Sequence, residues 1–161
     1  MMLLIRLGTL LLLFVGSSSQ PCRVPHFASS AVGKLPHRYD VLHELSPCLL
    51  VADFDGDGRR DLALNVRDRK SGKRGIAVWH SSDHAWHVIA AGRKLAPDGD
   101  DDFAWMDEWS IHNRAIPVEE GVDAGDPPKL RGDAILVEKQ ESASGLIFWD
   151  GKEYRWYQQR D

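Results

Sequence analysis

The chain contains 161 residues, of which 43% are hydrophobic and 27% are charged, and its formal net charge is −4. This length suits a single domain, and this composition excludes extended disorder and collagen-like repeats as the main description. A net-acidic chain is also a poor match for the phosphate backbone of nucleic acids, so we expect no nucleic-acid partner.

The first predicted element is a secretory signal peptide at residues 1–19. Arg6 and the amino terminus supply positive charge, residues 7–15 form an apolar stretch, and the small residues 16–19 are typical of a cleavage site. The apolar stretch is far shorter than the roughly 20 residues of a membrane-spanning helix, although a retained anchor is the alternative. We therefore predict cleavage after Ser19, a secreted or periplasmic location, and no stable membrane insertion of the mature chain.

The mature chain contains two cysteines, Cys22 and Cys48. An even number of cysteines in an oxidising compartment favours one disulfide, which would join the new N-terminus to a strand that begins near Leu49. Closing a loop of this length stabilises a protein by about 3 kcal/mol on the chain-entropy model. Two free or buried thiols are the alternative.

The rest of the chain consists of short apolar runs separated by Gly, Asp and Ser. Such runs, rich in aromatic and β-branched residues, are typical of β-strands, and Asp150-Gly151 is typical of a tight hairpin. No segment after residue 20 has a clear helical period, and residues 115–125 are expected to form a loop. We therefore predict an all-β fold of antiparallel β-meander units with no major helix after the signal peptide. The predicted strands lie at residues 49–52, 62–66, 75–79, 85–89, 103–105, 134–137, 145–149 and 153–157.

An internal repeat is the next feature of the sequence. Residues 75–79 and 145–149 share the pattern of Gly, three apolar residues and Trp, and Asp61 and Asp133 each precede an apolar strand. A sheet unit of this kind cannot bury its own face and must pack on a neighbour. We predict one β domain over residues 20–161 with two packed units, about 49–92 and 131–159. Chance likeness between two β-meanders is the alternative.

One motif points to an ion. Residues 53–61 place aspartates at positions 1, 3, 5 and 9 and glycines at positions 4 and 6. Calcium prefers six to eight oxygen ligands, which alternate side chains and the carbonyl of residue 7 can supply around one point. Four clustered carboxylates also repel one another without a cation. Phe54 would face the core, and a solvated acidic turn is the alternative. The predicted calcium ligands are Asp53, Asp55, Asp57, Arg59 (through its carbonyl) and Asp61.

The segment from Val51 to Leu64 resembles the FG-GAP/VCBS repeat, which provides the calcium loops of integrin-alpha-like β-propellers. An EF-hand or dockerin loop begins in the same way, but it needs flanking helices and an acidic residue where this chain has Leu64. The resemblance implies calcium bound by the four aspartates and the Arg59 carbonyl. A closed propeller needs at least four blades, whereas this chain has material for about two, and residues 131–133 replace the loop in the second unit. The resemblance therefore implies the ion site and not the whole propeller.

Other clusters favour ordinary structural roles. His80, His84 and His87 surround a hairpin with Asp83, but residues 84 and 87 of a strand point to opposite faces, so we interpret these histidines as exposed turn residues and not as zinc ligands. Most of the four tryptophans at 105, 109, 149 and 156 are expected to pack in the core and not to form a sugar-binding face. The Arg-Gly-Asp tripeptide at residues 131–133 is a motif that integrins bind, and its Asp is expected to begin a strand. The acidic run Asp98, Asp100, Asp101 and Asp102 favours a solvated loop over a weaker cation site.

These features predict an exported calcium-binding β-repeat protein that is a structural or protein-interaction module and not an enzyme, with an unidentified protein as its possible partner. The first alternative is a periplasmic or secreted inhibitor or immunity-type protein that blocks a hydrolase. The second is a metal-dependent hydrolase built on Glu108, His112 and the acidic run at residues 98–102. We predict no catalytic residues and no cofactor other than Ca²⁺.

Overall fold

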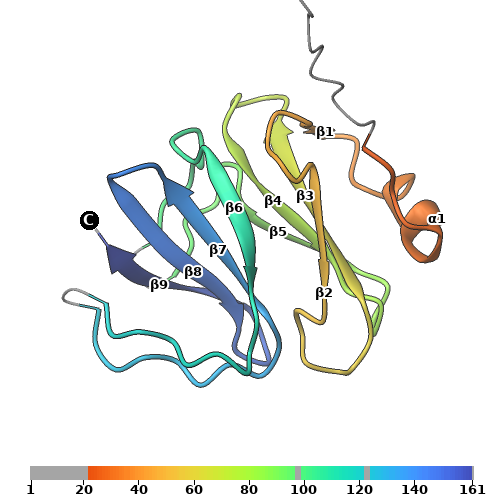
Figure 1. Cartoon of the computed structure of the whole chain (residues 1–161). Coiled ribbons are helices and arrows are strands. Elements are labelled where there is room, and N and C mark those ends of the chain that lie inside the picture. Colours follow the sequence, from red (N-terminus) through yellow and green to blue (C-terminus); the bar gives the residue numbers. More distant parts are fainter. Residues whose placement is uncertain (1–21, 97–98, 122–123, 161) are drawn as a thin grey trace, which may run out of the picture.

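Two antiparallel β-sheets dominate the part of the chain that the computed structural model describes, which comprises residues 22–96, 99–121 and 124–160 (Figure 1). We call the sheet within residues 39–90 the first sheet and the sheet within residues 108–160 the second sheet. Two short helical turns precede both sheets. The elements in chain order are η1 (His26–Ala28), α1 (Ser29–Val32), β1 (Tyr39–Val41), β2 (Leu49–Ala52), β3 (Asp61–Asp68), β4 (Arg74–Trp79), β5 (Trp86–Ala90), β6 (Glu108–His112), β7 (Ala134–Lys139), β8 (Ala143–Trp149) and β9 (Tyr154–Arg160).

Both sheets are built largely from strands that follow one another in the sequence. The second sheet is a meander in the order β6-β7-β8-β9. The first sheet has the order β1-β3-β4-β5, and β1 and β2 pair with different parts of the same edge of β3. The prediction of an all-β, antiparallel fold without a major helix is confirmed for the described residues. The β8–β9 connection is the tight hairpin predicted from Asp150-Gly151, with the Asp150 N–H donating to the Glu153 carbonyl (3.1 Å).

The strand predicted at residues 103–105 is wrong. Asp102 accepts a hydrogen bond from the Arg74 N–H (2.9 Å), and the Phe103 N–H donates to the Arg74 carbonyl (3.0 Å). These bonds hold a turn against the start of β4 and bury Phe103 completely, so its apolar character reflects the core and not a strand. The short strand β1 and the strand β6, which reads Glu-Trp-Ser-Ile-His, escape prediction because neither is a continuous apolar run.

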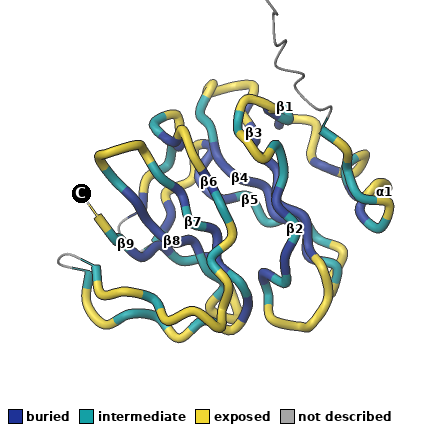
Figure 2. Tube along the Cα trace, viewed as in Figure 1, coloured by how far each residue is buried: buried dark blue, intermediate teal, exposed yellow. Residues whose placement is uncertain are grey.

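The main hydrophobic core is formed by side chains of both sheets. Phe54 is fully buried in it, as the sequence predicts. Each fully buried aliphatic or aromatic side chain contributes roughly 1.5–3 kcal/mol to folding, so this core is the principal force that joins the sheets. Figure 2 shows that the strands are largely buried and that the connections are largely exposed. The core includes Ala63, Ile76, Val78 and Ile89 of the first sheet, and Trp109, Ile135, Val137, Ile147, Tyr154 and Trp156 of the second.

A second cluster covers the opposite face of the first sheet. Ala28, Ala31 and Leu35 of the N-terminal segment pack with Leu62 and Leu64 of β3. We call residues 22–38 the N-terminal cover; Figure 1 shows α1 beside the first sheet. Because both faces of the first sheet are covered, almost every residue of β3 is buried.

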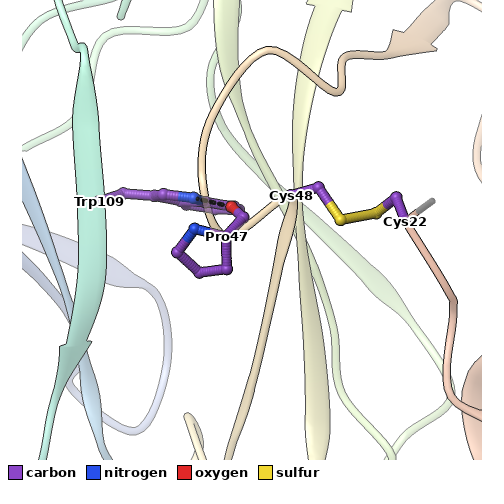
Figure 3. The surroundings of a disulfide bond; sticks show 4 residues. All are labelled: Cys22, Pro47, Cys48 and Trp109. Carbon is purple, nitrogen blue, oxygen red and sulfur yellow. Dashed lines mark hydrogen bonds between the residues drawn. A yellow bond between two sulfur atoms is a disulfide. The ribbon is translucent and has the colours of Figure 1, made fainter. Parts of the chain in front are cut away.

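The predicted disulfide between Cys22 and Cys48 is confirmed, and it ties the N-terminal cover to the start of β2. Figure 3 shows that the residue next to this bond is also attached to the other sheet. The Pro47 carbonyl accepts a 2.6 Å hydrogen bond from the indole N–H of Trp109 on β6. One short segment therefore connects the cover, the first sheet and the second sheet.

A long connection covers the outer face of the second sheet. Val118, Ala124 and Leu130 pack against Leu146 and Tyr157. We call residues 113–133 the C-terminal cover; its described residues contain neither helix nor strand, as predicted for residues 115–121 and 124–125. The Tyr157 hydroxyl fixes it by accepting a hydrogen bond from the Gly121 N–H (2.9 Å) and donating one to the Gly125 carbonyl (3.1 Å).

The predicted signal peptide at residues 1–19 lies outside the described residues, as does Asp98 of the acidic run. Across the described ranges, no helix has both the length and the apolar character needed to cross a membrane.

Candidate metal centre

The connection from β2 to β3, which we call the acidic loop, is folded by its own aspartate side chains. Asp53 accepts hydrogen bonds from the backbone N–H groups of Gly56 (2.8 Å) and Gly58 (3.0 Å). These glycines have φ angles of 81° and 87°, which residues with a Cβ rarely adopt. Asp55 and Asp57 each accept a bond from the N–H two residues later in the chain. The alternation of Asp and Gly therefore produces a tight turn with its carboxylates held in place.

Three of the four predicted carboxylate ligands converge. Asp53, Asp55 and Asp61 each place a carboxylate oxygen within 4.8 Å of the others, an arrangement that can hold a metal ion. The carboxylate of Asp57 is not part of this group. Its Oδ1 accepts the Arg59 N–H (2.7 Å), and its Oδ2 lies 3.7 Å from Arg59 Nε. The roles of Asp57 and of the Arg59 carbonyl as ligands stay predictions.

Asp61 holds the two ends of the acidic loop together. Its Oδ2 accepts hydrogen bonds from the N–H groups of Phe54 (2.9 Å) and Asp55 (3.3 Å). Its Oδ1 accepts a bond from the Ser81 N–H (2.9 Å), beyond the end of β4. Burial raises the pKa of Asp61 to about 6, and the nearby charge of Asp55 acts in the same direction. A cation among the three carboxylates would favour the charged form that burial opposes.

The acidic loop rests directly on the start of the second sheet. The Asp53 carbonyl accepts a 2.7 Å hydrogen bond from the Asp133 N–H. A Cβ on Gly56 would lie 2.5 Å from the Arg131 carbonyl oxygen, and a Cβ on Gly132 would lie 2.5 Å from the Asp53 carbonyl oxygen. Both glycines are therefore required by the close approach of the two backbones. The Arg-Gly-Asp tripeptide serves here as a packing contact, with Gly132 buried under the loop.

A cationic side chain already touches one of the three carboxylates. The guanidinium of Arg114 bonds to Oδ2 of Asp53, while the Arg114 N–H donates to Asp133 (2.9 Å). The Asp55 carboxylate contacts a neutral group instead, because its Oδ2 accepts a hydrogen bond from the Ser82 hydroxyl. One guanidinium cannot balance three carboxylates, so the oxygen donors and the remaining negative charge fit a hard cation such as Ca²⁺ or Mg²⁺.

The prediction that the three histidines are exposed turn residues is wrong for His80, whose exposed fraction is 1%, and for His87, which is half-buried in β5. His80 Nε2 lies 2.6 Å from the Tyr154 hydroxyl, and burial lowers the pKa of the His80 imidazole to about 4, with the neighbouring His87 acting in the same direction. His84 does lie elsewhere, stacked on Trp79 at a ring-centroid distance of 5.9 Å. Sequence reasoning missed His80 because its main partner is 74 residues away.

The other candidates have structural partners. Asp101 pairs with Lys73, and Asp100 accepts the Asp101 N–H (2.7 Å), so both aspartates already have partners within the protein. Glu108 accepts a hydrogen bond from Gln140 (2.7 Å), and His112 Nε2 lies 3.0 Å from the Ile116 carbonyl oxygen. Neither belongs to a potential metal-binding group among the described residues. As predicted, the tryptophans at 105, 109, 149 and 156 pack in or against the main core.

Comparisons with protein-family models, with curated proteins and with solved structures gave no match to this chain. The resemblance of residues 51–64 to the FG-GAP/VCBS repeat therefore stays a prediction, which rests on the acidic loop and its flanking strands.

Proposed function

We propose that the chain is an exported calcium-binding β-repeat protein, in which the ion has a structural role at the junction of the two sheets. The observation that carries this proposal is the convergence of Asp53, Asp55 and Asp61 in a loop that packs on the second sheet. All the donors are oxygens, which calcium prefers. The disulfide fits an oxidising compartment, and this supports export.

In this proposal the chain orients the carboxylate ligands before the ion binds, and the ion supplies the positive charge that balances them. Asp61 is oriented by three backbone N–H groups, and Asp53 by two. Each therefore loses little rotational freedom on binding. The Asp53 carbonyl also accepts a hydrogen bond from the Asp133 N–H. An ion that fixes the acidic loop would therefore also fix this contact with the second sheet. The protein then presents a stable surface to a partner, as a structural or interaction module.

Unfolding in calcium and in a calcium chelator tests this proposal. A ligand that binds only the folded state adds about 2.7 kcal/mol to the free energy of unfolding at a hundredfold excess over Kd. We expect chelator to lower the melting temperature by several degrees and calcium to restore it. Magnesium should substitute poorly, because it demands a tighter octahedral shell and loses water reluctantly.

Three alanine variants locate the effect. Asp55→Ala removes a converging carboxylate and should abolish the calcium response. Asp57→Ala tests the one predicted aspartate that lies outside the group, and a retained response would limit the site to three carboxylates. Asp101→Ala is the matched control, because that aspartate pairs with Lys73 away from the acidic loop. Equal melting temperatures in calcium and chelator, with no heat of binding at millimolar calcium, would refute the proposal.

A further inference from the structure

A second cluster of ligating side chains lies beside the acidic loop, at the turn between β4 and β5. His80, Asp83 and His87 each place one nitrogen or oxygen ligand atom within 4.8 Å of the others. The first is buried, the second is exposed and the third is intermediate, so the group extends from the core to the surface. We propose that these three residues form a binding site for a divalent transition-metal ion such as Zn²⁺.

The hairpin brings the three side chains together. The ladder between β4 and β5 continues past Trp79, because the His80 N–H donates to the Ala85 carbonyl (3.0 Å). The rings of His80 and His87 consequently lie on the same face, with centroids 4.2 Å apart. Asp83 Oδ1 accepts the Ala85 N–H (2.9 Å), and Asp83 Oδ2 lies 3.3 Å from His87 Nε2. The turn therefore points one carboxylate oxygen at the two imidazoles.

The second sheet fixes the orientation of both rings. His80 Nε2 is bonded to the buried Tyr154 hydroxyl (2.6 Å), which leaves Nδ1 as the nitrogen available to an ion. Ligating histidines in proteins are usually oriented by such a hydrogen bond on their other nitrogen. Trp149 packs edge-on against the rings of His80 and His87, each at a centroid distance of 4.9 Å. These contacts come from residues far away in the sequence, so the site is complete only in the folded domain.

The donor chemistry distinguishes this site from the acidic loop. Imidazole nitrogens suit zinc, copper and nickel, whereas calcium takes oxygen ligands. Tetrahedral zinc, with bonds of about 2.0–2.1 Å, separates its ligand atoms by about 3.4 Å, close to the 3.3 Å between Asp83 and His87. Three protein ligands leave a fourth position for water or another donor. A cavity of about 340 Å³ adjoins this group: its lining includes His87, Trp149 and Tyr154, but not His80 or Asp83.

This site does not depend on the proposed calcium function, although the two lie close together. His80 Nδ1 is 3.7 Å from Asp55 Oδ2, so Asp55 is the point at which the sites meet. Asp53, in contrast, contacts Arg114 and the glycines of the acidic loop. Asp53→Ala should therefore weaken calcium binding and leave zinc binding intact, which separates failure of one proposal from failure of the other.

Calorimetry with Zn²⁺ and absorption spectroscopy with Co²⁺ test the site, using the untagged exported protein with and without millimolar calcium. We expect one ion per chain and the visible absorption bands that Co²⁺ shows in a nitrogen–oxygen site of low coordination number. His87→Gln and Asp83→Asn should each lower the zinc affinity by tenfold or more. Tyr154→Phe keeps all three ligands and should lower the affinity by about 10–100-fold, because it removes the bond that orients His80.

His84→Gln is the matched control. His84 lies in the same turn but stacks on Trp79, on the other side of the hairpin, so this variant should bind zinc as tightly as the parent. Circular dichroism checks that each variant is folded, and the exposed Asp83 and half-buried His87 give variants that do not disturb the core. Absence of stoichiometric zinc binding, equal loss in His84→Gln, or unchanged affinity in both His87→Gln and Asp83→Asn would overturn the proposal.

Discussion

The two sheets share a meander of antiparallel strands but use the equivalent connection for different purposes. In the first sheet, the link from β2 to β3 is the short acidic loop, whose carboxylates converge. In the second sheet, the link from β6 to β7 is the C-terminal cover, which packs apolar side chains on the outer face. The first sheet takes its cover from the N-terminal segment instead, fastened by a disulfide.

This difference teaches how two packed sheets can bury their outer faces without a further sheet beside them. An antiparallel sheet can leave one face in solvent, but here one face of each sheet meets the other sheet and the second face is covered as well. The outer faces are buried by segments that belong to neither sheet, one fastened by a covalent link and the other by hydrogen bonds of Tyr157. Three experiments can test this difference between the two sheets.

Removal of the disulfide should destabilise the N-terminal cover more than the C-terminal cover. We expect the Cys22→Ser, Cys48→Ser double variant to lose about 2–4 kcal/mol in the free energy of unfolding, measured with urea. Hydrogen exchange should show that amides of residues 28–35 lose protection first, because only the N-terminal cover is fastened by this bond. Amides of the C-terminal cover are the internal control. An equal loss of protection in both covers would contradict the comparison.

Two buried tyrosines provide a matched pair, one in each sheet. Tyr157→Phe removes a hydroxyl that bonds to Gly121 and Gly125, and it should cost about 1–2 kcal/mol in urea unfolding. The Tyr39 hydroxyl is buried and has no hydrogen-bond partner among the residues that the structure describes. Tyr39→Phe should therefore be neutral within about 0.5 kcal/mol, or stabilising. A loss in Tyr39→Phe as large as that in Tyr157→Phe would show that hydrogen bonding does not distinguish the two positions.

The smallest effect concerns a feature that both sheets share. Each has an aspartate at a hairpin whose carboxyl pKa is lowered. Asp68 accepts backbone hydrogen bonds from Ser71 and Lys70 and pairs with Arg38, so its pKa falls to about 2. Asp150 reaches a pKa of about 2 in the second sheet in the same manner, through the Glu153 N–H first and then Arg155.

Each of these carboxylates stabilises the fold above its unfolded pKa of about 3.9, and the contribution is lost as pH falls toward about 2. Asp68→Asn and Asp150→Asn should each be less stable than the parent at neutral pH, and the difference should shrink between about pH 4 and pH 2. Urea unfolding of the parent and of each variant across this pH range measures the difference in the free energy of unfolding. A difference that stays constant with pH would show that the charge of the aspartate is not the cause.

The sequence was sufficient where structure depends on near neighbours. The acidic loop, the hairpin at Asp150 and the burial of Phe54 follow from the order of Asp, Gly and apolar residues within a few positions. The two-cysteine count also led to the correct disulfide. These features need only local turn chemistry or a pair with one possible partner.

The parts that escaped prediction depend on distant contacts. Arg114 reaches Asp53 across 61 residues, and Tyr154 reaches His80 across 74. His80 consequently resembles a turn residue in the sequence, although it is buried beneath the second sheet. Phe103 shows the converse error, because its apolar neighbours suggest a strand while the backbone of Arg74 holds it in a turn.

The two covers also limit the packing of further sheets on the molecule. Tandem arrays lengthen when an uncovered face accepts the next repeat, and they stop at terminal units whose outer faces are already occupied. Here the N-terminal cover and the C-terminal cover occupy both such faces. In the described part of the chain, the large hydrophobic side chains left exposed are Ile111 and Ile116, too few to seat another sheet. Within the described residues, both outer sheet faces are therefore already occupied by the chain's own segments, and neither offers an open apolar surface on which a further sheet could stack.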